Sequence, residues 1–409
     1  MKKFITLLLV LTGMVSTASA WTGTLKGSFD SWGSGVAFTA IGNWEMYVKI
    51  SGDYIHSSDV TFKPTIDGKG WRGPKGKDSD WEITPNGSTV FGTDVAGDHN
   101  FLIKKNANAT DIYVHLKTYD DGKNDWWEVK VLVVESYTSY PIKFSSTWGS
   151  VSAYSYYNDI PLHGTWPGES LTTTSGSCSA TLSVLPGSKV IFTNGEDGDA
   201  NKTDALDVVR NGVYSKANGL SHISTTITSA GYATFSSEKA VDFTGKGVDA
   251  YIASAITDNK VVLTKHNKVP SYNGVLLKGS AGTYDIPVTD SPDDIDANML
   301  MATVLATEVA ASTSGTYHYV LANSSGIGFY NVATATTSAA GKAYLETATA
   351  LASETGARAG WIFEDEPTGI QQVETAKVND NAYFNLAGQR VAQPTKGLYI
   401  VNGKKVIIK

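Results

Sequence analysis

Short runs in which apolar and polar residues alternate recur along most of this chain, separated by Gly, Pro, Asn and Asp. A period of two residues is typical of strands with one buried face, whereas a helix needs a period of 3.6. Residues 111–119 and 126–134 are two such runs, and the turn-rich sequence between them predicts a β-hairpin. We therefore expect an all-β protein, in which tandem immunoglobulin-like β-sandwich modules precede a β-rich domain and a short C-terminal β tail. Residues 339–355 suit a helix as well as a strand.

The N-terminus has the pattern of a secretory signal peptide. Lys2 and Lys3 precede an apolar stretch at 4–15 and the small residues 18–20, Ala-Ser-Ala. The apolar stretch is shorter than the roughly 20 residues of a membrane-spanning helix, and no other stretch is longer. We expect export, cleavage near Ala20 and no transmembrane segment. Composition predicts the segments 1–20 (signal peptide), 21–137 (β-sandwich and candidate carbohydrate-binding module), 138–217 (second sandwich), 218–365 (β-rich domain of unknown role) and 366–409 (tail).

The charge and the cysteine content exclude several classes of function. Nucleic-acid affinity comes from Lys and Arg side chains that neutralise phosphates. This chain has 40 acidic and only 33 basic residues, so its charge argues against nucleic-acid binding. The single cysteine, Cys178, allows neither an intramolecular disulfide nor a multi-cysteine zinc site. The sequence has no nucleophile elbow, zinc-protease helix or phosphate-binding loop. We expect a protein without catalytic residues, cofactor or metal; the acidic turn at 120–125 could hold calcium, but its composition is explained by the turn alone.

Aromatic residues are concentrated in the first half of the chain, with nine of the ten tryptophans before residue 167. Within 151–157, alternation places Tyr154 and Tyr156 on the strand face opposite the small residues 151, 153 and 155. The Pro-Gly pair after Trp166 predicts a turn that holds the indole beside this strand.

Such a group of rings suits sugars, because a pyranose has an apolar C–H face that stacks on aromatic rings and hydroxyls that need hydrogen bonds. Tyr154, Tyr156 and Trp166 are therefore candidate carbohydrate-binding residues. The loop at 194–199 adds polar candidates, Asn194 and Asp197. The alternative interpretation is that the aromatic residues pack in the core.

Residues 142–214 resemble a family 26 carbohydrate-binding module, a starch-binding β-sandwich. The matching pieces, in order, are VSAYSYY (151–157), GTWPGESL (164–171), KVIFTNGEDGD (189–199) and NGVYS (211–215). Leu171 stands where the family often has Met. The resemblance implies that Tyr154, Tyr156 and Trp166 stack on an α-1,4-glucan and that Asn194 and Asp197 are weaker polar contacts.

The first module carries a second resemblance. LKGSFDSWGSG (25–35) is similar to the start of glycogen-binding-type domains, and DVTFKPTIDGKGWRG (59–73) resembles outer-membrane starch-binding modules. Trp71, in a Gly-rich loop, is the ring that we expect to be exposed and to bind sugar, and Trp81 is second. We expect Trp32 and Trp44 to pack in the core.

The second half of the chain resembles parts of exported proteins. TITSAGYATFSSEKAVDF (226–243) and ARAGWIFEDEPTGI (357–370) resemble a repeat-associated domain of secreted Gram-negative proteins, which implies no activity. NLAGQRV (385–391) and GLYIVNGKKVIIK (397–409) are similar to a type IX secretion sorting tail, with a type I′ hairpin at Asn402-Gly403. This resemblance implies contact with the type IX secretion machinery and attachment to the cell surface.

The sequence thus predicts non-catalytic binding of starch-like α-glucan (starch, glycogen or maltooligosaccharides) at the bacterial cell surface, retaining polysaccharide for separate surface amylases. Two alternatives stay open. One is a glycoside hydrolase with an unrecognised site in 218–365, and the other is an adhesin or structural surface protein.

Overall fold

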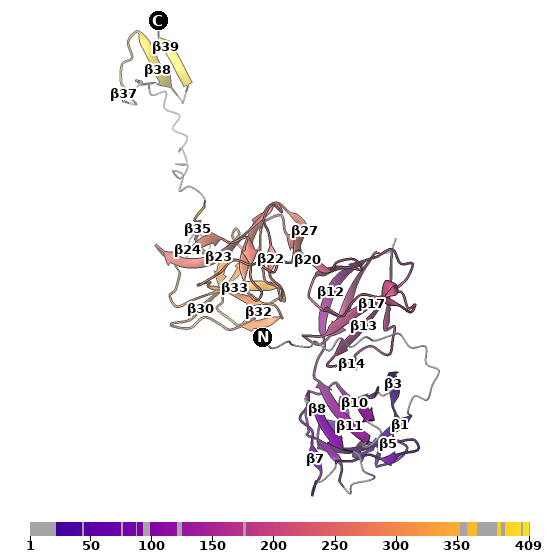
Figure 1. Ribbon diagram of the computed structural model, residues 1–409. Coiled ribbons are helices and arrows are strands. Elements are labelled where there is room, and N and C mark those ends of the chain that lie inside the picture. Colours follow the sequence, from indigo (N-terminus) through magenta and orange to yellow (C-terminus); the bar gives the residue numbers. More distant parts are fainter. Residues whose placement is uncertain are drawn as a thin grey trace, which may run out of the picture. The chain divides into compact units, whose positions relative to one another are not determined.

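The computed structural model describes residues 22–42, 45–74, 77–86, 88–92, 99–120, 125–174, 177–351, 358–365, 383–385, 389–401 and 404–408. The regular structure of these residues is β-strand apart from three short 3-10 turns, and no α-helix occurs among them, which confirms the all-β prediction (Figure 1). The chain divides into two compact units after Ile362. The expected signal peptide, 1–20, lies outside the described residues.

The first sandwich consists of two sheets that enclose one apolar core. In β10 (Asp111–Asp120), alternate side chains such as Ile112, Val114 and Leu116 are buried in this core. The predicted hairpin is confirmed, with Asp111 opposite Val134. One sheet has the order β2 (Val36–Ala37), β1 (Gly23–Gly27), β5 (Val60–Ile66), β9 (Phe101–Ile103) and β7 (Trp81–Glu82), with β6 (Gly70–Trp71) also beside β5; the other has β3 (Thr39–Gly42), β4 (Glu45–Ser51), β10 (Asp111–Asp120), β11 (Asp125–Val134) and β8 (Ser88–Gly92).

The second sandwich shares a sheet with the region that follows it. Its first sheet has the order β16 (Ser177–Val184), β12 (Thr138–Ser145), β19 (Gly212–Ser215), β20 (Gly219–Ile227) and β27 (Gly282–Pro287). The expected boundary at 217/218 falls in the turn between β19 and β20, and the backbone hydrogen bonds cross it. The second sheet has β14 (Ile160–Pro161), β13 (Val151–Tyr157), β17 (Lys189–Thr193) and β18 (Leu206–Asp207), with β15 (Glu169–Leu171) also beside β13.

Apart from β27, which belongs to the shared sheet, the described strands of residues 228–363 form two larger sheets and two strand pairs. Residues 342–347 are a strand, so the helix considered for 339–355 does not form there; residues 352–357 lie outside the described part. The first larger sheet has β21 (Tyr232–Phe235), β26 (Val275–Gly279), β23 (Val248–Thr257), β24 (Lys260–Lys265) and β35 (Trp361–Phe363), and the second has β28 (Leu300–Thr303), β33 (Lys342–Thr347), β30 (Tyr317–Ala322), β31 (Gly328–Asn331) and β34 (Arg358–Ala359). The pairs are β22 (Val241–Asp242) with β25 (Lys268–Val269) and β29 (Thr307–Val309) with β32 (Thr336–Ser338).

The tail unit is a small sheet, drawn in yellow in Figure 1. Its strand order is β37 (Arg390–Val391), β36 (Tyr383–Phe384), β38 (Gly397–Val401) and β39 (Lys404–Ile408). Strands β38 and β39 pair antiparallel, as the alternation predicts, while Asn402 and Gly403 between them lie outside the described residues.

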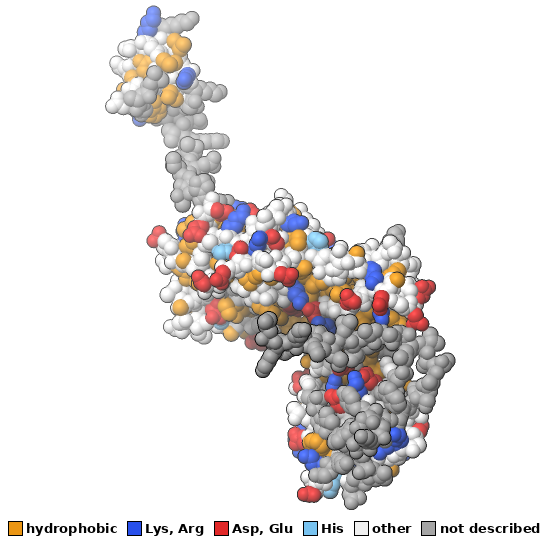
Figure 2. Space-filling view, in the orientation of Figure 1, with side chains coloured by type: hydrophobic (Ala, Val, Ile, Leu, Met, Phe, Trp, Pro, Cys, Tyr) orange, Lys and Arg blue, Asp and Glu red, His pale blue; other side chains and the backbone are white. Residues whose placement is uncertain are grey.

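The visible surface of residues 218–362 carries acidic and basic side chains that are scattered among polar ones rather than gathered into a patch of one sign (Figure 2). No helix in the described ranges has the length and hydropathy that a membrane span needs.

Candidate carbohydrate-binding surface

Strand β13 separates small from aromatic side chains as the sequence predicts. Val151 and Ala153 are buried in the core of the second sandwich. Tyr154 and Tyr156 lie on the other face, with ring centroids 5.8 Å apart and ring planes inclined by 36°. The period of two residues in a strand is the cause, since every second side chain must leave the core.

Trp166 reaches the same face from a tight turn. The Gly168 N–H donates to the Thr165 carbonyl at 2.8 Å, and the Trp166–Pro167 peptide is cis, as in a type VI turn. Gly168 has φ +86°, and a Cβ there would lie 2.2 Å from the Ala153 carbonyl oxygen. The Trp166 ring centroid is 5.7 Å from that of Tyr154, with the planes inclined by 60°. We call these three rings, Tyr154, Tyr156 and Trp166, the aromatic platform.

The platform is neither flat nor fully exposed. Tyr154 is only 7% exposed, while Tyr156 and Trp166 are half-buried. Burial raises the pKa of Tyr154, and the nearby Tyr47 and Glu45 of the first sandwich raise it further. Tyr154 is therefore the inner ring of the platform, and the two flanking rings supply its accessible surface.

The polar loop after β17 is held together by its own amides. The Asn194 side chain donates to Asn201 Oδ1 at 3.0 Å and accepts from the Glu196 N–H at 2.9 Å. Asn201 in turn donates to the Asp197 carbonyl at 2.7 Å. The loop adjoins the Trp166 turn, since a Cβ on Gly195 would lie 4.0 Å from Pro167 Cγ. Asn194 thus fixes the loop, and the exposed Asp197 carboxylate is the better placed of the two to meet a ligand.

The face of the first sandwich near Tyr154 carries a buried charge network. Glu45 forms an ion pair with Lys117, and its carboxylate lies 3.7 Å from Nε2 of the fully buried His115. Burial would raise the pKa of Glu45, but hydrogen bonds and charges from these two partners lower it to about 2. The Tyr113 hydroxyl also donates to the Leu162 carbonyl at 3.2 Å, so this face contacts the second sandwich directly.

The first sandwich carries an aromatic pair of its own. The rings of Trp71 and Trp32 have centroids 6.2 Å apart with planes inclined by 55°, and Lys26 Nζ lies 5.8 Å from the Trp71 centroid. Trp71 and Trp81 are half-buried, and Trp44 lies outside the described residues.

The expectation that Trp32 packs in the core is wrong, because Trp32 is 37% exposed. Its backbone has φ +61°, in a turn where the Asp30 carboxylate accepts from the N–H groups of Gly27 and Gly35. The polar and glycine-rich sequence around Trp32 (DSWGSG) is the signal that indicates a turn rather than a core strand.

No family model, curated protein or solved structure matches this chain. Within the described ranges no group of three or more His, Cys, Asp or Glu side chains is arranged to hold a metal, and residues 121–124 of the acidic turn considered for calcium lie outside those ranges. Cys178 is buried, and burial raises the pKa of its thiol.

Proposed function

We propose that this protein binds starch-like α-glucan without cleaving it and that the second sandwich carries the main site. The observation that supports this most is the convergence of three aromatic rings on one outer sheet face, two from strand β13 and one from the turn at Trp166, 10 residues after Tyr156. Sugar C–H faces would stack on Tyr156 and Trp166, and Tyr154 would fix the position of both rings. Asp197 would accept hydrogen bonds from hydroxyls.

The inclined rings favour a curved chain over a flat one. The rings of Tyr156 and Trp166 are inclined to Tyr154 by different angles, 36° and 60°, so they are not parallel to each other. They cannot both stack on the sugars of a flat ribbon, whereas successive residues of an α-1,4-glucan turn relative to one another. Affinity is expected to be modest, because a shallow surface buries little of its ligand compared with an enclosed pocket.

The proposal includes the location and the partners. The basic, apolar and small-residue pattern of residues 1–20 supports export, and the similarity of 385–409 to a sorting tail supports passage through the type IX machinery to the outer cell surface. There the protein would hold polysaccharide for separate amylases.

The test is affinity electrophoresis of the mature chain in native gels that contain amylopectin. We expect retardation of the unmodified protein and loss of most of this retardation in Trp166→Ala. Stacking of one nucleic-acid base on an aromatic side chain is worth about 1–3 kcal/mol, and we expect a contribution of similar order from a sugar ring. Tyr272→Ala is the matched control, since Tyr272 is a 63% exposed ring outside the platform. Equal retardation of Trp166→Ala and the unmodified protein would refute the proposal.

One observation favours the second candidate, a structural surface protein. The 7% exposure of Tyr154 is what a packing residue at a junction between sandwiches would show. The two functions predict different melting temperatures for the Trp166→Ala variant. A glucan-binding ring can be removed with little change, whereas a large drop would mean that Trp166 is mainly a packing residue.

The pair Trp32 and Trp71 is proposed as a second, weaker glucan surface. Both rings lie on the outer side of the sheet that contains β1 and β5, and Lys26 beside them can donate to a sugar hydroxyl. Two sites on one chain would raise the apparent affinity for a long polysaccharide without any new contact.

A further inference from the structure

A cavity of about 480 Å³ lies over the outer face of the sheet that the second sandwich shares with the following region. Strands β16, β12 and β20 of that sheet line it, and residues 340–342 at the start of β33 close one side. Hydroxyl side chains from two of the strands face it: Ser179, Thr181, Ser224 and Thr226.

Two lysines line the cavity, and they differ in their partners. Lys143 Nζ donates to Ser224 Oγ at 3.1 Å and pairs with Asp285 at 3.3 Å. Lys342 is half-buried, and no residue that the structure describes accepts a hydrogen bond from its ammonium group or pairs with it. Burial alone lowers the pKa of Lys342. A desolvated cation without a counter-charge is unfavourable, so this side of the cavity is complementary to an anion.

The backbone that carries Lys342 is fixed before any ligand arrives. The Ser236 hydroxyl donates to the Lys342 carbonyl at 2.6 Å, and the Gly341 N–H donates to the Thr303 carbonyl at 2.7 Å. A rigid support of this kind reduces the entropy that ordering the side chain would lose on binding.

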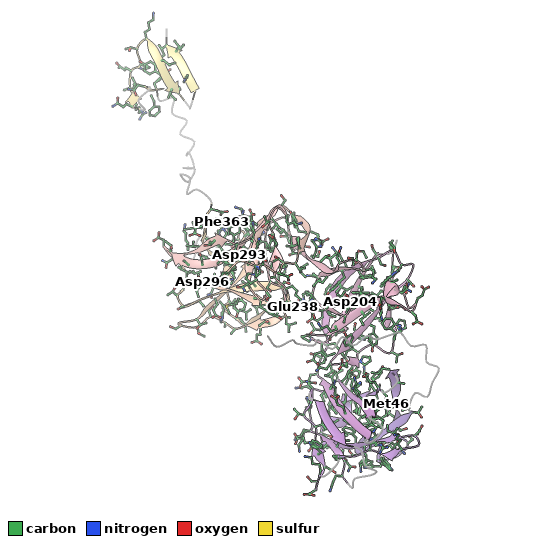
Figure 3. All side chains as sticks on the ribbon, viewed as in Figure 1. Met46, Asp204, Glu238, Asp293, Asp296 and Phe363 are labelled. Atoms are coloured by element: carbon green, nitrogen blue, oxygen red, sulfur yellow. The ribbon has the colours of Figure 1, made fainter. Side chains whose placement is uncertain are left out.

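The other charges around the cavity do not neutralise Lys342. Asp285 is already engaged with Lys143, and hydrogen bonds from Ser224 and Lys143 offset its burial and lower its pKa. Arg210 approaches Gly341, where a Cβ would lie 3.4 Å from Arg210 Cδ, and its backbone N–H donates to Glu238. Figure 3 shows Glu238 where the second sandwich meets the following sheets. The charged residues that line the cavity itself are both lysines, Lys143 and Lys342.

We propose that this cavity binds a small polyhydroxylated anion, with its carboxylate or phosphate group on Lys342 and its hydroxyls on the serine and threonine side chains of the shared sheet. A sugar acid or a sugar phosphate has this chemistry. A neutral glucan would not stack in the cavity as it would on the platform, because stacking needs an exposed ring. The one aromatic side chain that lines the cavity, Phe235, is only 3% exposed.

The test uses the mature chain and three probes in isothermal titration: glucuronate, inorganic phosphate and glucose. We expect glucuronate to bind more tightly than phosphate, which lacks the hydroxyl contacts of a sugar ring, and glucose to give no heat that depends on Lys342. Lys342→Met should weaken glucuronate roughly ten- to a hundredfold, the range for losing a hydrogen bond to a charged group. Lys342→Arg should keep most of the affinity.

Lys265→Met is the matched control, because Lys265 is a lysine of the same region that pairs with Asp249 at 2.7 Å. Trp166→Ala should bind glucuronate like the unmodified protein, so the result does not depend on the glucan site. No binding of glucuronate at millimolar concentration, or equal binding by the unmodified protein and a Lys342→Met variant that melts normally, would overturn the proposal.

Discussion

Gly168 has a conformation that places the Trp166 ring beside Tyr154 in the platform. Its positive φ of +86° is open to glycine, and the space where a Cβ would stand is occupied by the Ala153 carbonyl oxygen. The sequence motif Trp-Pro-Gly indicated a turn beside β13, and the turn is present. What the motif did not contain is the inclination of the rings, because that depends on side-chain packing against residues distant in sequence.

Gly168→Ala is expected to destabilise the protein by roughly 1–3 kcal/mol and to weaken amylopectin binding, because the turn must move to relieve both strain and overlap. Urea unfolding measures the first effect and affinity electrophoresis the second. Gly164→Ala is the control, since Gly164 also has a positive φ, +94°, but nothing lies within 4 Å of a Cβ there. If both variants lose equal stability, the contact with Ala153 has no energetic role.

Trp32 is exposed in a turn, whereas the sequence predicts a core position. The Asp30 carboxylate accepts hydrogen bonds from two backbone N–H groups in this turn, which leaves Trp32 37% exposed. The polar and glycine-rich residues around Trp32 are the sequence signal that indicates this turn.

At the level of elements, alternation predicted the strands well and their partners poorly. The period of two residues predicts which side chains face a sandwich core, and the structure agrees for Ile112, Val114 and Leu116 and for Val151 and Ala153. The same pattern contains no information on what packs against the outer face of a sheet. It therefore could not predict that the first sandwich lies against Tyr154. For the ambiguous segment 339–355, pairing of β33 with β28 and β30 decided in favour of a strand.

The carboxylate of Glu45, on strand β4, contributes to the stability of the fold because its pKa is lowered. The pKa of Glu45 falls from 4.5 to about 2 in the folded protein, so its contribution to stability is complete above pH 4.5 and is lost as the pH falls toward 2. The contribution is at most about 3 kcal/mol. Glu45→Gln should therefore lower the free energy of unfolding at pH 7, and the difference from the unmodified protein should shrink between pH 5 and pH 2.

Chemical denaturation at several pH values measures this difference. Glu308→Gln, at an exposed position of β29, serves as the comparison for removing a carboxylate. A Glu45→Gln difference that stays constant over the whole range would show that the charge network does not stabilise the fold.

At the scale of the whole molecule, two glucan surfaces on one chain make a prediction that neither makes alone. Trp71→Ala and Trp166→Ala should each reduce retardation by amylopectin, and the double variant should lose more than the sum of the two effects on a long polymer. With maltooligosaccharides too short to span both surfaces, the two effects should simply add, because linkage between sites then disappears. Additive losses on both ligands would mean that the surfaces act independently.

The shared sheet also limits how this protein can be dissected. Strand β19 pairs with β12 on one side and with β20 on the other, so a fragment that ends at residue 217 would strip one row of N–H and C=O groups bare. Bare edges of this kind recruit further strands, and such a fragment would be expected to self-associate into aggregates. A cut after Ile227 would only move the problem to β20, which needs β27, so the smallest well-behaved piece must extend past Pro287.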